Sequence, residues 1–263
     1  MSNRSLITFT KSSLVLLSSF FLILFLIGYI WWPLLDEYIS YFNPQIPVWQ
    51  QIDWLLIGNF LVMSVLVMIN SDLQQDIPFI LISLAGGFII EFWGTSSRLW
   101  QYYTFEVPPM WIIPAWPIAA LSVKRISLIL NKLISKFSND SLVFLYYLIY
   151  GLFFILFLGF VWPMPAHPLT ILAVILCGFL IITEENNRFS LVILLSGSIL
   201  GYFLELWGTT RLCWTYYTGG TPPLFTVLAH GMASVAIWRV FKLYQNLISR
   251  SQIHWVKKYL VLN

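Results

Sequence analysis

Long apolar segments recur along the whole chain, separated by short stretches that carry most of its charged residues and prolines. Eight segments are long enough to cross a hydrocarbon layer as helices: 13–34, 54–70, 77–93, 110–130, 142–162, 168–183, 190–207 and 224–241. The apolar residues are continuous and lack the alternation typical of membrane β-barrel strands. The pattern therefore predicts an all-α protein, a polytopic membrane helix bundle of about eight transmembrane helices.

The composition excludes a soluble globular protein. Of the 263 residues, 59% are hydrophobic and 10% are charged, whereas about 25% are charged in soluble domains. The sequence has no phosphate-binding loop, no nucleic-acid motif and no His/Glu/Asp cluster with metal-ligand spacing. We therefore expect no metal, no cofactor and no nucleic-acid partner, and membrane lipid as the surroundings of most of the chain.

The basic residues indicate how the chain is oriented. If the N-terminus is cytoplasmic, 12 of the 14 Lys and Arg residues lie on the cytoplasmic side, and only Arg98 and Arg211 lie opposite. Cytoplasmic loops of membrane proteins carry such an excess. The first apolar segment is longer than the core of a signal peptide and no small-residue cleavage site follows it. We expect a multi-pass protein of the cell (inner) membrane with both termini in the cytoplasm.

A motif occurs twice in the chain. A shift of 114 residues places 87–109 on 201–223 without a gap, and eleven of the 23 positions are identical. The identical pairs are Gly87/Gly201, Glu91/Glu205, Trp93/Trp207, Gly94/Gly208, Thr95/Thr209, Trp100/Trp214, Tyr102/Tyr216, Tyr103/Tyr217, Thr104/Thr218, Pro108/Pro222 and Pro109/Pro223. Because four helices per repeat is an even number, the repeats are predicted to be parallel. We expect a first four-helix repeat at 1–137, a second at 138–243 and a cytoplasmic tail at 244–263.

Glu91 and Glu205 are the candidate catalytic residues. Each lies near the outer end of a predicted helix, where burial and the helix dipole favour the protonated acid. If the repeats bring the two together, repulsion raises one pKa further and gives an acid and a base. The alternative is a structural ion pair of Glu91 with Arg98 and of Glu205 with Arg211.

The residues around the two glutamates are the candidate substrate-binding residues. Aromatic side chains at a membrane surface commonly form an interfacial belt, but here they keep a fixed distance from a Glu in both copies, and aromatic faces stabilise cations. His230 lies opposite Trp116 in the repeat and is either a proton shuttle or a core histidine. The predicted substrate-binding set is Trp93, Arg98, Trp100, Tyr102, Tyr103, Trp207, Arg211, Trp214, Tyr216, Tyr217 and His230.

The stretch from Glu91-Phe-Trp-Gly94-Thr95 through Trp100-Gln-Tyr102-Tyr103-Thr104 to Pro114-Ala115-Trp116 resembles the integral-membrane carotenoid hydratase family of carotenoid biosynthesis. That family adds water to the ends of acyclic or monocyclic carotenoids. The transferable positions are Glu91, Gly94, Tyr103 and Trp116. The chain departs from the family in lacking its Gly-x-Pro-Phe-Gly element and in having Tyr-Tyr where the family has Tyr-x-Tyr. The resemblance implies an apolar, isoprenoid-type substrate.

Three functions fit these features. The first is a membrane enzyme, such as a hydratase or other lyase, that uses Glu91 and Glu205 for acid–base chemistry on a lipidic or isoprenoid substrate entering from the bilayer. In this reading Arg98 or Arg211 orients a polar head group. The second is a proton-coupled transporter or carrier, and the third is a non-catalytic scaffold in which the motif only joins the two halves.

Overall fold

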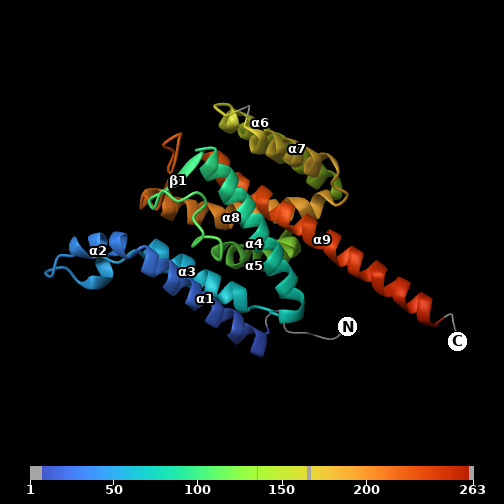
Figure 1. The fold of residues 1–263 in the computed structure, drawn as a ribbon, viewed down its shortest axis with the longest axis horizontal. Helices are drawn as coiled ribbons and strands as arrows, with labels where there is room; N and C mark the ends of the chain where they lie inside the picture. Colours follow the sequence, from blue (N-terminus) through green and yellow to red (C-terminus); the bar gives the residue numbers. More distant parts are fainter. Residues whose placement is uncertain (1–7, 135, 165–166, 261–263) are drawn as a thin grey trace.

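The computed structural model describes residues 8–134, 136–164 and 167–260, with only the backbone given over 250–260. In these residues the regular structure is helical except for two short strands (Figure 1). The elements are α1 (Lys11–Ile30), α2 (Trp32–Ser40), a 3-10 turn (Val48–Gln50), α3 (Trp54–Met68), α4 (Leu73–Ser96), β1 (Trp100–Tyr102), α5 (Ala115–Ile134), α6 (Asn139–Val161), α7 (Pro168–Ile182), α8 (Asn187–Thr210), β2 (Trp214–Tyr216) and α9 (Leu224–Leu260). The all-α prediction is confirmed. The two chain termini, predicted to be cytoplasmic, lie outside the described residues.

Five of the described helices are long and apolar enough to cross a membrane: α1, α4, α6, α8 and the Leu224–Ser249 part of α9. The segments predicted at 54–70 and 168–183 form α3 and α7, which have 15 residues each and are shorter than the roughly 20 residues that a span needs. These helices identify a membrane-embedded protein.

The segment predicted at 110–130 begins later than expected, as α5 at Ala115. Residues 110–114 form turns instead. The reason is Pro114, because the residue before a proline avoids the helical region of backbone conformation. This shift matters for the site, since it leaves Trp116 in the first turn of α5.

Four helices form the centre of the molecule. Helices α4, α5, α8 and α9 pack against one another, with α5 against α8 and α4 against α9. In Figure 1 the pair α1 and α3, in blue, lies on one side of this centre, and the pair α6 and α7, in yellow, lies on the other. Helix α3 contacts α5 and α8, and α6 contacts α8 and α9.

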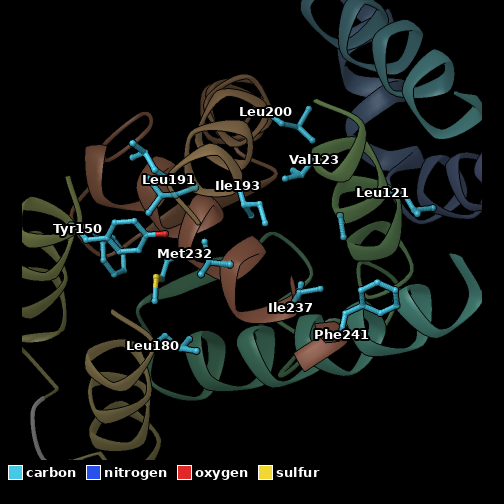
Figure 2. Packing of buried hydrophobic residues seen from close by; sticks show 14 of the residues in the cluster. Leu121, Val123, Tyr150, Leu180, Leu191, Ile193, Leu200, Met232, Ile237 and Phe241 are labelled. Carbon is cyan, nitrogen blue, oxygen red and sulfur yellow. The ribbon is translucent and has the colours of Figure 1, made fainter. Parts of the chain in front are cut away.

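The core is made of side chains from these central helices. Figure 2 shows Val123 of α5, Ile193 of α8 and Ile237 of α9 among the buried residues that fill the space between them. The outer surface is just as apolar, with Phe25 76% exposed and Ile182 84% exposed. A soluble protein rarely leaves so continuous an apolar surface open, so this surface fits contact with lipid.

A buried ion pair joins α4 to α5 at the end of the bundle away from the motif. Asp76, 1% exposed, accepts from Lys124 Nζ at 2.8 Å and from Arg125 Nη2 at 2.7 Å. Because an unpaired charge in apolar surroundings is costly, this pairing fixes the packing of the two helices.

Candidate functional site

The two copies of the motif meet through their strands. β1 and β2 pair antiparallel, with Trp100 opposite Tyr216 and Tyr102 opposite Trp214. Trp100 and Trp214 are equivalent in the repeat, as are Tyr102 and Tyr216, so the pairing has a local two-fold axis. It brings the end of α4 beside the end of α8.

Both copies take the same backbone path from helix to strand. The Leu99 amide donates to the Gly94 carbonyl at 2.9 Å, and the equivalent bond in the second copy has the same length. Arg98 and Leu212, also equivalent, have φ of +57° and +56°. Since residues with a side chain rarely adopt this left-handed conformation, its occurrence at both positions shows that the two turns are built alike.

Glu91 is 4% exposed and accepts three hydrogen bonds. Trp100 Nε1 donates to Oε2 at 3.0 Å, Tyr102 Oη donates to Oε1 at 2.9 Å, and Trp116 Nε1 donates to Oε1 at 3.1 Å. The first two donors come from β1 and the third from α5. A buried carboxylate needs such partners, and here all of them are aromatic side chains.

Glu205 is 3% exposed and has the equivalent surroundings with one change. Trp214 Nε1 lies 3.0 Å from Oε2, and Tyr216 Oη lies 2.7 Å from Oε1. The third partner is His230 Nε2, 2.8 Å from Oε1, at the position that Trp116 has in the first copy. We call the two glutamates and these six partners the carboxylate cage.

The two phenols of the carboxylate cage remain O–H donors near neutral pH. Burial, together with the adjacent carboxylates, raises the pKa of Tyr102 and of Tyr216 well above the usual value. A phenol that stays protonated can donate to a carboxylate, as both do here.

The glycines of the motif make room for the aromatic rings. A Cβ at Gly94 would lie 1.9 Å from the ring of Trp100, and one at Gly208 would lie 1.9 Å from the ring of Trp214. A Cβ at Gly87 would lie 2.3 Å from Trp116, and one at Gly201 would lie 2.5 Å from His230. The duplicated glycines are therefore explained by close packing of the cage.

The partners of one glutamate pack on the partners of the other. The ring centroids of Trp100 and Tyr216 are 6.0 Å apart, and those of Tyr102 and Trp214 are 5.8 Å apart. Trp116 and His230 stack at 6.1 Å with an interplanar angle of 20°. Such contacts fix ring positions, so the carboxylate cage is one packed unit shared by both copies.

Both glutamates line one cavity of about 340 Å³. Its walls are almost entirely apolar and come from α1, α3, α6 and α7 as well as from the central helices. Three lining residues, Ile89 of α4 and Leu172 and Leu176 of α7, are also 63%, 59% and 48% exposed on the outer surface. Residues of α4 and α7 therefore line the cavity and also lie on the apolar outer surface.

The predicted substrate-binding residues divide into two groups. Seven of them line this cavity: Trp93, Trp100, Tyr102, Trp207, Trp214, Tyr216 and His230. The other four, Arg98, Tyr103, Arg211 and Tyr217, are not among its lining residues. Tyr103 and Tyr217 instead donate to the carbonyls of Ile30 and Phe160, which ties each loop to a preceding helix.

The arginines do not pair with the glutamates in the part of the chain that the structure describes. Arg211 Nε lies 2.8 Å from Asp53 Oδ2, and Arg98 is exposed. The alternative prediction, a structural ion pair of each glutamate with the arginine of its own motif copy, is therefore wrong. The reason is the turn at the end of each helix, which directs aromatic side chains to the carboxylate.

The sequence did not predict the residues that join each copy of the motif to the other half of the chain. Trp207 Nε1 donates to Asp53 Oδ2 at 3.0 Å, and Trp93 Nε1 donates to Thr170 Oγ1 at 3.1 Å. Asp53 precedes α3, and His167, its equivalent in the repeat, precedes α7 and lies 3.3 Å from Ser97. A shift of 114 residues places Asp53 on His167. Because the two residue types differ, a search for identical positions does not reveal this pair.

The charge of Asp53 is stabilised by its neighbours. Burial raises the pKa of Asp53, but hydrogen bonds from Arg211, Leu56 and Trp207 and the charge of Arg211 lower it more. The pKa therefore lies below the usual value, and this carboxylate stays ionised at neutral pH.

Comparisons with protein-family models, with characterised proteins and with solved structures find no match to this chain. Among the residues that the structure describes, no three His, Cys, Asp or Glu side chains lie where they could hold a metal ion.

Proposed function

We propose that the protein is an integral membrane enzyme that performs glutamate-based acid–base chemistry on a lipidic substrate. The observation that carries this proposal is that Glu91 and Glu205 line the same apolar cavity and are both held by aromatic donors. Two buried carboxylates in one apolar site are a common arrangement for an acid and a base.

The substrate class follows from the walls of the cavity. They hold apolar chains well and polar or charged solutes poorly, because such solutes would lose their hydration. A lipid would enter between α4 and α7, whose residues line the cavity and also lie on the outer surface, without leaving the bilayer. The resemblance of 91–116 to the carotenoid hydratases supports an isoprenoid substrate, on which a hydratase or another lyase would act.

The chemistry is a proton transfer that creates positive charge. A carboxylic acid that protonates a carbon–carbon double bond leaves a carbocation, and the faces of Trp and Tyr rings stabilise cations. Rings from both copies line the same cavity as the two carboxylates. The predicted contact of Arg98 or Arg211 with a polar head group stays a prediction, and it applies to a part of the substrate outside this cavity.

In the proposed arrangement the protein lies in the cell (inner) membrane and crosses it eight times, in two parallel repeats. Both termini are in the cytoplasm. The cage at the ends of α4 and α8 then lies near the extracytoplasmic surface. The ion pair of Asp76 with Lys124 and Arg125 lies at the cytoplasmic end, in agreement with the excess of basic residues there.

The test compares lipid extracts from cells that express the wild type, Glu91→Gln, Glu205→Gln and the control Glu106→Gln. Glu106 is an exposed residue of the first motif and does not line the cavity. We expect one lipid to accumulate and another to disappear in both cage variants, while the control matches the wild type. Unchanged extracts from both cage variants, at normal levels of folded protein, would contradict the proposal.

The same variants separate the two alternative functions. A carrier predicts proton-coupled uptake into proteoliposomes that both cage variants lose. A scaffold predicts lower thermal stability of both variants without a change in any small molecule.

A further inference from the structure

The two halves of the carboxylate cage differ at one of their three partners. Trp and Tyr from the strand are the same in both halves, but the partner from the following helix is Trp116 for Glu91 and His230 for Glu205. Both partners bind the Oε1 oxygen and stack on each other. The difference therefore lies in chemistry and not in position.

Indole and imidazole differ in what they can do with a proton. The indole N–H only donates, whereas an imidazole nitrogen can donate, accept or become charged. A proton added to Glu91 would have the phenol of Tyr102 as its one acceptor, because Trp100 and Trp116 can only donate. A proton added to Glu205 can be shared with His230 Nε2 at 2.8 Å.

We propose that the two carboxylates have different roles: Glu205 and His230 form the pair that holds and transfers the proton, and Glu91, which has no imidazole partner, does not take part in the transfer. This inference rests on the proposed function and divides its acid–base work between the two copies. Glu91 is then the group that stabilises positive charge on the substrate, and His230 acts through Glu205.

The proposed step adds water across a carbon–carbon double bond. Protonated Glu205 gives its proton to one carbon of a double bond, whose π electron pair forms the new C–H bond. The other carbon becomes a cation, which the carboxylate of Glu91 and the aromatic faces stabilise. Water adds its oxygen lone pair to this carbon and loses a proton to the pair of Glu205 and His230, which restores the starting state.

The surroundings of His230 fit a proton-transfer residue. The titratable groups of the cage around it are Glu205 from α8, Tyr216 from β2, Glu91 from α4 and Tyr102 from β1. A second cavity, of about 20 Å³, lies beside it between α5, α8 and α9. This is room for about one water molecule.

The first test is infrared spectroscopy of the purified full-length protein over a range of pH, which detects the carbonyl stretch of a protonated carboxylic acid in a buried site. We expect a buried-acid band that is present in the wild type and in Glu91→Gln and absent from Glu205→Gln. A band that disappears in Glu91→Gln and persists in Glu205→Gln would overturn the assignment, as would a wild type with no such band at any pH.

The second test exchanges the two partners. His230→Trp gives Glu205 the surroundings of Glu91 and should change the pH range over which the band appears, and adding Trp116→His should restore that range. In the exchanged protein the band should now depend on Glu91. A structural role for His230 would not move the band from one glutamate to the other, so an unchanged band in His230→Trp overturns the proposal.

His230→Gln guards against a misfolded variant, because Gln keeps a hydrogen-bond donor without a titratable group. It should fold, as judged by thermal unfolding, and show the band over a different pH range from that of the wild type. A normal band in folded His230→Gln refutes the role of His230. The predicted infrared pattern together with unchanged lipid extracts would support the proton assignment and contradict the enzyme function. Failure of the proton assignment can therefore be distinguished from failure of the proposed function.

Discussion

Replacement of Gly94 by alanine tests whether the carboxylate cage is as tightly packed as the structure shows. The added Cβ would lie 1.9 Å from two atoms of the Trp100 ring, whereas ordinary contacts begin at 3.4 Å. The ring would have to move by about 1.5 Å. Trp100 is not free to do so, because it donates to Glu91 at 3.0 Å and packs on Trp93 with centroids 5.7 Å apart.

Two costs add up in this variant. Forcing a methyl group into a packed site costs about 1–3 kcal/mol, and losing a hydrogen bond to a charged group costs about 1.5–3 kcal/mol. We therefore expect Gly94→Ala to lower the free energy of unfolding by about 2.5–6 kcal/mol. Gly208→Ala should behave in the same way, because its Cβ meets Trp214 at the same distance.

The assay is unfolding of the detergent-purified protein, followed by circular dichroism. The matched control is Gly151→Ala in the middle of α6, where an added Cβ has nothing within 4 Å. Alanine is the better helix former by about 0.5–1 kcal/mol, so this control should be slightly more stable than the wild type. Equal stability of Gly94→Ala and Gly151→Ala would refute the close packing of the cage.

Two further changes test the ion pairs. Asp76→Asn should destabilise the protein by about 3–5 kcal/mol in the same unfolding assay, because Arg125, 4% exposed, would keep a buried charge without its partner; a loss below about 1 kcal/mol would contradict this. Asp53→Asn should make the stability of the fold less dependent on pH. Since the pKa of Asp53 is lowered by folding, its contribution is complete above the unfolded value of about 3.9 and is lost as the pH falls through the lower folded value. Melting temperatures from about pH 6 to about pH 3 should therefore fall more steeply in the wild type than in the variant.

The sequence was sufficient to predict the helices because a lipid-exposed helix must be apolar on all sides, and such segments are visible without any knowledge of contacts. Every predicted span coincides with a described helix. Helix α5 begins later in the chain than predicted, because hydropathy does not account for the effect of Pro114 on the residue before it. The short helix α2 was not predicted, since nine residues are too few for a periodic signal.

The duplicated motif contains six of the eight residues of the carboxylate cage, but it did not predict how they bind one another. Trp116 and His230 each contact a glutamate 25 residues earlier in the chain. Such contacts depend on how α5 packs on α4 and how α9 packs on α8, which the sequence does not specify. The three-residue strands were not predicted either, because their pairing depends on contact between the two copies.

The pairing of the two copies also explains why the site needs both of them. Each glutamate has all three of its hydrogen-bond partners in its own copy, yet, in the described residues, the strand that carries two of them pairs with the strand of the other copy. A single copy would leave the polar edge of that strand unpaired close to apolar surroundings, which is costly. Duplication therefore supplies two equal carboxylate sites that stabilise each other, and one residue, His230 in place of Trp116, is enough to make them chemically different without changing the packing that holds them.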